Sequence, residues 1–228
     1  MIRHPSFLTQ YLTRERKLST LLERPSSEVS ALLNEACDFT RGVHQTLGQY
    51  PYLGWMDRRK NELLYLAVRC LKPHCVLETG VAAGVSSWII LEALRKNGEG
   101  KLYSIDIGIK DFDGITLPAS EPIGFLVPRD LRSQWELVIG ASRDALPKVL
   151  QSVRSIDIFY HDSLHTLDNM MYEFKTVYQH LNVGGLLASD NIEFNDAFDE
   201  FCHAVKAKHE MLYGFGLARK GAQGPLRQ

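Results

Sequence analysis

Apolar positions follow two different spacings along the chain, and the spacing changes near residue 73. Over residues 7–42 and 57–71 the apolar side chains fall three and four positions apart, which is the period of an amphipathic helix. Pro25, Ser26 and Ser27 interrupt the first of these stretches, as a helix break followed by a new helix start would. The amino-terminal part of the chain is therefore predicted to be a helical leader.

From residue 74 onward, short apolar runs alternate with segments of helical spacing. The runs that predict strands lie at residues 74–79, 101–107, 135–139, 156–160 and 186–189. Helical spacing follows at residues 86–96, 143–153, 167–181 and 194–208, and residues 213–221 could form a last antiparallel strand. Because each return between parallel strands needs a connection of helix length, this alternation predicts a doubly wound, mostly parallel α/β fold.

These patterns divide the chain into a helical N-terminal extension at residues 1–72, a main domain at residues 73–220 and a flexible tail at residues 221–228. The extension is expected to cap the sheet or to form a dimer contact, and we favour a homodimer. Residues 108–134 interrupt the rhythm of the main domain with several prolines and glycines. Long irregular insertions are usually binding loops or lids, so we expect a substrate-side loop with a short helix near residues 128–133.

The composition narrows the possible partners. The chain has 228 residues, is 45% hydrophobic and carries a net charge of -1, so it has no overall field that would attract nucleic acid or an anionic membrane. No stretch reaches the roughly 18 apolar residues of a membrane-spanning helix. The four cysteines show neither a CxxC pair nor the density of a disulfide scaffold, which favours buried thiols in a reducing compartment. A cytoplasmic location is predicted.

The first predicted strand leads into a glycine-containing turn and then directly into a helix. The segment VLETGVAAGVSS contains the pattern ExGxxxGxS, formed by Glu78, Gly80, Gly84 and Ser86. Glycines at this position let the backbone approach a ligand, and the helix start offers N–H donors to an anionic group. A dinucleotide fold would need GxGxxG here, and the middle glycine is missing. A ligand with a carboxylate, an amine and a nucleoside fits this pattern, although such turns also occur without any ligand.

Two further strand ends carry polar residues that suit a nucleoside. Asp106 ends the second predicted strand, where an acid can accept the ribose hydroxyls, or can simply cap a turn. Ser142 and Arg143 follow the third strand, and Ser142 could either lie at the edge of an adenine or cap the next helix. Since ligands of α/β sheets bind at the carboxyl ends of the strands, these residues are candidates for one site.

Three oxygen-bearing side chains follow the next two strands. Asp162 lies in FYHDSLHT, and Asp190 and Asn191 lie in LLASDNIEF. Carboxylate and amide oxygens without a cysteine suit a hard divalent cation such as Mg²⁺, which leaves coordination positions open for a substrate. Aspartate and asparagine are also common in turns, and this simpler interpretation stays open.

In this order, the motifs resemble the class I S-adenosylmethionine-dependent methyltransferases, in particular the catechol and caffeoyl-CoA O-methyltransferases. The resemblance spans roughly residues 55–198 and rests on VLETGVAAGVSS, IGASRDALP and SDN. It implies a Rossmann-like sheet of seven strands with a helical N-terminal extension. It also implies that S-adenosylmethionine donates a methyl group to a hydroxyl of a small molecule, with the help of Mg²⁺ that chelates two adjacent substrate oxygens.

Residue by residue, the resemblance implies a role for each motif. Glu78, Gly80 and Ser86 would hold the methionine end of the cofactor, Asp106 the ribose, and Ser142 with Arg143 the adenine, and Gly84 would also bind the cofactor. Asp162, Asp190 and Asn191 would bind Mg²⁺, and Asp162 would in addition contact the cofactor and act in catalysis beside His165. Where the family has a basic lysine three residues after the first metal aspartate, this chain has His165. A histidine can remove a proton near neutral pH, and it could equally be a surface or structural imidazole.

Several alternatives remain open from the sequence. His161 could stack near the adenine or pack in the core. Aromatic residues that could line an acceptor pocket, or pack in the core, are Trp55, Phe112, Phe125, Trp135 and Phe194. The rival functions are a metal-independent methyltransferase in which His165 acts alone, a non-catalytic module that binds S-adenosylmethionine, and a nicotinamide-dependent dehydrogenase.

Overall fold

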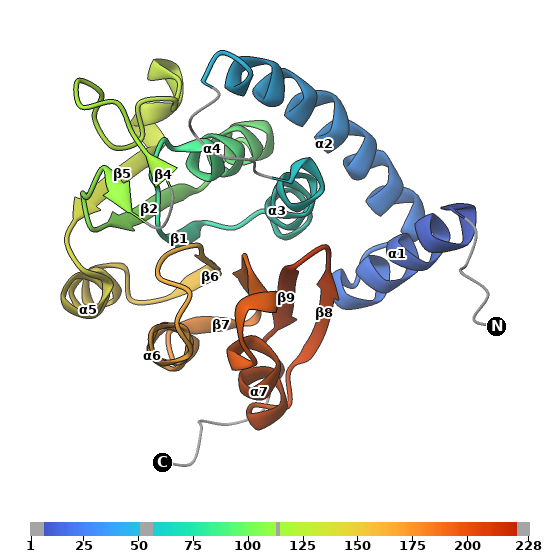
Figure 1. Ribbon diagram of the computed structural model, residues 1–228. Helices are drawn as coiled ribbons and strands as arrows, with labels where there is room; N and C mark the ends of the chain where they lie inside the picture. The colour runs from blue at the N-terminus through green and yellow to red at the C-terminus, as the bar shows by residue number, and fades with distance from the viewer. Residues whose placement is uncertain (1–6, 51–56, 113–114, 223–228) are drawn as a thin grey trace.

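A seven-stranded sheet forms the centre of the molecule, with helices on both of its faces (Figure 1). The computed structural model describes residues 7–50, 57–112 and 115–222. The strands of the sheet are β1 (Cys75–Thr79), β2 (Lys101–Asp106), β5 (Trp135–Ile139), β6 (Ile156–His161), β7 (Leu181–Ser189), β8 (Lys208–Leu212) and β9 (Phe215–Arg219). The helices are α1 (Phe7–Leu22), α2 (Ser26–Leu47), α3 (Arg58–Leu71), α4 (Val85–Asn97), α5 (Ser142–Val153), α6 (Leu167–Tyr178) and α7 (Ala197–Ala204).

The order of the strands is β5-β2-β1-β6-β7-β9-β8. β5, β2, β1, β6 and β7 pair in parallel, and β9 is antiparallel to both of its neighbours. The doubly wound, mostly parallel Rossmann-like fold predicted from the sequence is therefore confirmed. The order of the strands reverses between β1 and β6, which is where open α/β sheets bind their ligands.

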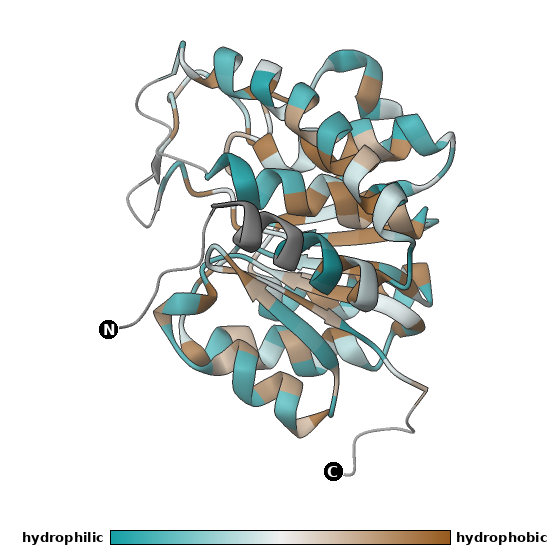
Figure 2. Cartoon of the chain, turned by 90° about the vertical axis from the view of Figure 1, so that its right-hand side faces the viewer, coloured by the Kyte–Doolittle hydropathy of each residue, from teal (hydrophilic) through white to brown (hydrophobic). Residues whose placement is uncertain are grey.

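Successive residues of the central strands face opposite helical layers, because side chains alternate along a strand. Val76 and Ile158 belong to the core beneath α3 and α4, and Leu77 and Phe159 belong to the core beneath α5, α6 and α7. Figure 2 shows the sheet between these layers, with several of its strands coloured as hydrophobic. Because helices cover both faces of the sheet, the sequences of the central strands are continuous apolar runs.

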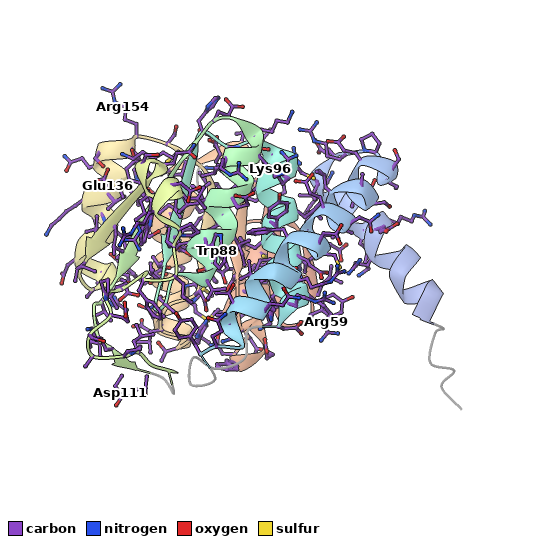
Figure 3. The ribbon with its side chains drawn as sticks, turned by 90° about the horizontal axis from the view of Figure 1, so that it is seen from above. Arg59, Trp88, Lys96, Asp111, Glu136 and Arg154 are labelled. Atoms are coloured by element: carbon purple, nitrogen blue, oxygen red, sulfur yellow. The ribbon has the colours of Figure 1, made fainter. Side chains whose placement is uncertain are left out.

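The two amino-terminal helices form an outer layer over α3 and α4 (Figure 1). A stripe of α2 is buried and consists of Val29, Leu33, Ala36, Thr40 and Val43. The Tyr65 hydroxyl of α3 donates to Glu35 Oε1 of α2 at 2.6 Å, and Phe39 meets the indole of Trp88 on α4 with ring centroids 6.2 Å apart (Figure 3). The leader breaks at Pro25 as expected, and its second helix continues beyond Gly42 to Leu47.

The carboxyl-terminal part of the domain differs from the sequence-based expectation. The helix predicted at residues 194–208 is wrong at both ends, because α7 spans Ala197–Ala204 and Lys208 begins β8. β8 is an edge strand in which no residue is fully buried, so it lacks the apolar run that marks a buried strand. β7 begins at Leu181, where a helix was expected to end, and Gly184 and Gly185 within it obscured the strand pattern.

The insertion at residues 108–134 lies over the turn after β1. It contains a hairpin, β3 (Asp111–Phe112) with β4 (Ile115–Thr116), and a 3-10 helix, η1 (Arg129–Gln134). Asp111 of the hairpin lies at the edge of the molecule (Figure 3). The backbone N–H groups of Gly124 and Leu126 donate to the carbonyls of Ala82 and Ala83 at 2.8 and 3.0 Å. The insertion is thereby anchored to the glycine loop, by which we mean residues 80–84.

Candidate active site

One cavity of about 660 Å³ lies at the carboxyl ends of the parallel strands, a size within the usual range of small-molecule sites. Most of the residues singled out in the sequence line it. They are Gly80, Ser86, Asp106, Ser142, Arg143, Asp162, His165, Asp190 and Asn191. The fold thus brings together residues that are far apart in the chain, because parallel strands place their carboxyl ends at one edge of the sheet.

Gly80 starts the glycine loop and is required by the backbone around it. Its φ is +86°, and a Cβ atom there would lie 1.9 Å from the carbonyl oxygen of Asp162. The N–H of Asp162 also donates to the carbonyl of Thr79 at 2.8 Å. The loop after β1 and the loop after β6 are therefore in direct backbone contact at the floor of the cavity.

Glu78 and Gly84 lie behind the cavity wall and do not line the cavity. The Glu78 carboxylate is fully buried and accepts hydrogen bonds from the hydroxyls of Ser86, Ser87 and Ser104 at 2.5, 2.6 and 2.7 Å. Burial raises the pKa of Glu78 to about 7, although the three hydroxyls act in the opposite direction. The contact of Glu78 and Gly84 with a bound cofactor stays a prediction.

Gly84 faces the insertion, since a Cβ atom on it would lie 2.8 Å from the Cα atom of Gly124. Its φ of +93° is in the left-handed region that favours glycine. The second glycine of the motif therefore allows the insertion to approach the start of α4.

Asp106 ends β2 and ties the glycine loop to the sheet. Its Oδ2 accepts from the N–H groups of Val81 and Ala82 at 2.8 and 3.0 Å, and its Oδ1 accepts from Gly108 at 2.7 Å. The side chain thus has the turn-capping role weighed in the sequence and also lines the cavity. Oδ1 accepts only one of these hydrogen bonds, so it keeps a lone pair for a ligand hydroxyl.

Ser142 and Arg143 form the β5 side of the cavity. The capping alternative for Ser142 is wrong, because Ala141 is the N-cap of α5 and no side chain caps this helix. Arg143 is half exposed at the rim, where it pairs with Asp168 and lies over the ring of Tyr172, 4.5 Å from its centroid. Ser142 therefore lines the cavity and does not cap the helix.

Asp162 and His165 lie on the loop after β6. Asp162 Oδ2 accepts from the Tyr160 hydroxyl at 3.1 Å, and Oδ1 lies 3.7 Å from His165 Nε2. Burial and the neighbouring Asp190 carboxylate raise the pKa of Asp162 well above its usual range. The His165 side chain is only 7% exposed, so the expectation of a surface imidazole is wrong.

Asp190 and Asn191 follow β7 and have a partner that the sequence did not suggest. Lys60, in the first turn of α3, places its Nζ 2.5 Å from Asp190 Oδ1 and 2.8 Å from Asn191 Oδ1. The side chains of Lys60 and Asp190 are 12% and 9% exposed. No spacing in the sequence signals this contact, because it joins residues from the extension and the far end of the sheet.

A second buried polar cluster supports the β6 loop from below. Glu173 of α6 is fully buried and accepts from Thr79 at 2.6 Å, from Ser163 at 2.8 Å and from Asn169 at 3.1 Å, and its Oε2 lies 2.7 Å from His161 Nδ1. Burial would raise the pKa of Glu173, but the hydrogen bond and charge of His161 outweigh it and lower the pKa to about 2. His161 therefore packs in the core. Glu173 was not singled out in the sequence, since it looks like an ordinary helix-surface acid.

The aromatic residues weighed as pocket lining have different locations. Phe194 lines the cavity, with its ring 5.6 Å from that of His165. Trp135 packs against the core and donates to Ser104 at 2.9 Å, and Phe125 meets Tyr50 with ring centroids 5.6 Å apart. Trp55 and the side chain of Phe112 lie outside the described residues.

The sequence matches the methyltransferase domain family over residues 77–192, which is half of the chain, and the protein belongs to this family. The matched region contains β1 through β7 and nearly all the cavity residues described above. The predicted enzyme class is confirmed, and the dehydrogenase alternative is wrong. No curated protein matches the sequence significantly.

Solved structures of methyltransferases share the fold at low sequence identity. The S-adenosylhomocysteine-bound methyltransferase PaMTH1 of Podospora anserina is 16% identical, with a TM-score of 0.53 over 96% of this chain and 98% of that one. The O-methyltransferase TomG of Streptomyces achromogenes, involved in tomaymycin synthesis and solved with S-adenosylmethionine, is 19% identical, with a TM-score of 0.58 over 84% and 90%. An O-methyltransferase of Bacillus cereus bound to S-adenosylhomocysteine is 14% identical, with a TM-score of 0.55 over 91% and 97%.

Within the described part of the chain, no helix combines the length and the apolar character needed to cross a membrane. Each of the four cysteines is a free thiol, and only Cys70 and Cys202 are fully buried. The expectation of four buried thiols is therefore wrong for Cys37 and Cys75, which are partly exposed.

Proposed function

We propose that this methyltransferase uses S-adenosylmethionine to methylate a hydroxyl group of a small molecule. The observation that carries the proposal is the continuity of one cavity. The part at the ends of β1, β2 and β5, which we call the inner part, is lined by Gly80, Asp106 and Ser142, which suit a nucleoside. The part at the ends of β6 and β7, which we call the outer part, is lined by His165 and Asp190, which suit a reacting hydroxyl. Donor and acceptor could thus meet in a single cavity.

The inner part of the cavity fits S-adenosylmethionine on its own chemistry. α4 begins directly after the glycine loop with its N-terminal N–H groups. Asp106 Oδ1 can accept a hydrogen bond from a ribose hydroxyl, and Ile105 and Ile107 add apolar lining beside it. When bound, S-adenosylmethionine would supply a methyl group on a positively charged sulfur.

The outer part of the cavity would hold the acceptor hydroxyl and receive its proton. In the proposed reaction a C–O bond forms as the C–S bond breaks, the sulfur keeps the bonding electron pair, and the hydroxyl proton passes to an imidazole nitrogen of His165. Asp162 Oδ1 lies 3.7 Å from His165 Nε2, where it could orient the imidazole toward the acceptor. Positioning contributes most to such a reaction, because both groups are held in one cavity.

The residues expected to bind Mg²⁺ do not fit the ion in their present arrangement. The Oδ1 atoms of Asp190 and Asn191 are both hydrogen-bonded to the Lys60 ammonium. Asp162 Oδ2 accepts from Tyr160. The proposed reaction therefore uses no metal ion. The expectation that the acceptor carries two vicinal oxygens was based on chelation by a metal ion, and it no longer has that basis.

The lining of the outer cavity favours an acceptor with an apolar body. Leu164 and Phe194 line the cavity near His165, and they are 42% and 60% exposed. Exposed aromatic and aliphatic side chains at a cavity mouth are typical of binding sites for planar apolar molecules. A phenol fits this lining better than a free sugar.

The test is a transfer assay with methyl-labelled S-adenosylmethionine and a panel of phenols, catechols, hydroxy acids and sugars. We expect label in a phenolic methyl ether, identified by NMR, and S-adenosylmethionine binding by calorimetry. Asp106→Ala should weaken that binding, and Asp111→Ala, on the exposed hairpin, should leave it unchanged. Binding without transfer to any acceptor would instead support the non-catalytic module.

A further inference from the structure

Lys60 occupies the position that a divalent cation would take among the oxygens at the ends of β6 and β7. Its Nζ lies 2.5 Å from Asp190 Oδ1 and 2.8 Å from Asn191 Oδ1, and 3.9 Å from Glu193 Oε1. The ammonium is largely buried, with its side chain only 12% exposed. This arrangement was not foreseen from the sequence, in which Lys60 belongs to the helical extension.

An ammonium and a divalent ion cannot share these oxygens. Mg²⁺ binds oxygen at about 2.0–2.1 Å, and the single side-chain oxygen of Asn191 is the atom that the Lys60 ammonium contacts. The two cations would also repel each other at that distance. A metal ion could enter only if Lys60 moved away, and Lys60 is fixed at the start of α3, a helix buried between α2 and the sheet.

The position of Lys60 also suits a role in the reaction. A lysine ammonium has three N–H donors, and the contacts to Asp190 and Asn191 use two of them. Lys60 lines the cavity together with His165, so its third donor is available to an oxygen of a bound acceptor. A positive charge there would stabilise the negative charge that develops on the acceptor oxygen as its proton leaves.

We propose that the Lys60 ammonium replaces the divalent cation in this enzyme, so that methyl transfer needs no metal ion and the acceptor needs only one hydroxyl. The proposal rests on the proposed function. A metal ion binds two substrate oxygens in its coordination shell, whereas one N–H group binds one oxygen. The enzyme should therefore accept a phenol with a single hydroxyl as readily as a catechol.

The first experiment measures Mn²⁺ binding by electron paramagnetic resonance and needs no acceptor. Asp199, His203 and His209 form a separate group whose ligand atoms lie within 4.8 Å of one another, so every protein carries His203→Ala to remove that site. With Lys60 present, the signal of free Mn²⁺ should be unchanged. Lys60→Met should bind one Mn²⁺, and adding Asp190→Asn should abolish that binding.

Lys101→Met is the matched control, because Lys101 is an exposed lysine that pairs with Glu136 on the far edge of the sheet. It should bind no Mn²⁺. Binding of Mn²⁺ at Asp190 while Lys60 is present would overturn the proposal, and so would a Lys60→Met protein that binds none. Calorimetry with S-adenosylmethionine on the same proteins separates this result from the proposed function, because loss of that binding would refute only the latter.

The second experiment measures methyl transfer in a chelator. The wild-type rate should not change on addition of EDTA, and Lys60→Met should lose about 100-fold in kcat, the usual effect of removing one donor to a developing oxyanion. Lys60→Arg, which keeps the charge, should retain more activity than Lys60→Met. Activity that disappears in EDTA and returns with Mg²⁺, or a fully active Lys60→Met, would overturn the proposal.

Discussion

Two buried acids lie behind the residues that line the cavity. Glu78 and Glu173 are both fully buried, and each is held by several hydroxyl or amide donors. The charged groups around the two acids differ, because Glu173 faces an imidazole and Glu78 faces only hydroxyls and other acids. The pKa of one is therefore lowered to about 2, and that of the other is raised to about 7.

The raised pKa of Glu78 predicts a pH-dependent stability. The folded state holds the proton more tightly than the unfolded chain, so the contribution of Glu78 is most favourable below pH 4.5 and is lost as the pH rises toward about 7. The carboxyl groups of Asp106 and Asp162 interact electrostatically with Glu78, and a negative charge on either of them opposes ionisation of Glu78. The stability of wild type relative to Glu78→Gln should fall by about 3 kcal/mol over this range.

Urea unfolding of both proteins at several pH values measures this difference, in which the titrating groups that do not interact with Glu78 cancel. Glu136→Gln, on an exposed strand residue that pairs with Lys101, serves as the control and should show no such trend. A difference between wild type and Glu78→Gln that does not change with pH would contradict the argument.

At the level of helices and strands, the amino-terminal helices form part of the main core. Buried residues of α2 belong to the same apolar cluster as α3, α4 and the central strands. Glu35 of α2 also accepts hydrogen bonds from both Tyr65 and Arg69 of α3. The same packing holds the start of α3, and hence Lys60, against the ends of β6 and β7.

This packing predicts that the extension unfolds together with the sheet. Leu33 is 2% exposed, so Leu33→Ala should destabilise the whole protein by about 2–5 kcal/mol, the usual cost of a buried leucine truncated to alanine. Asn34→Ala, at the neighbouring exposed position, should change the stability by less than about 0.5 kcal/mol. Urea unfolding followed by circular dichroism and by tryptophan fluorescence should give one shared transition. Two separate transitions would show that the extension is an independent unit.

For the molecule as a whole, the cavity joins parts of the chain that have different structural origins. The glycine loop, the insertion, the ends of five parallel strands and the first turn of α3 all contribute to it. Its charged groups are likewise shared, since Asp106, Asp162 and Asp190 come from strand ends, whereas Asp57 and Lys60 come from the extension.

The homodimer expected from the apolar leader stays a prediction. Much of the apolar surface of α2 is used within the chain, against α3 and α4, which weakens that reason for a dimer. Light scattering should give twice the chain mass of 25.8 kDa if the dimer forms. A mass equal to a single chain would contradict it, with bovine serum albumin as a calibration control.

Local sequence was enough to identify the central strands, the glycine loop and the acids at the strand ends. Buried parallel strands need continuous apolar runs, and Gly80 needs a backbone that only glycine adopts there without a clash. These requirements act on neighbouring residues, so they leave a mark in the sequence. β8 left none, because none of its residues is fully buried and an edge strand needs no continuous apolar run.

Which polar groups meet was decided only in three dimensions. Asp190, Asn191 and Asp162 looked like ligands for a metal ion as long as their partners were unknown, and the packing of α3 brings an ammonium onto two of them. The contact between Glu173 of α6 and His161 of β6 likewise joins side chains from two different elements. Such contacts depend on how helices pack across a sheet, and neither apolar periodicity nor motif spacing encodes the side chain that arrives from another element.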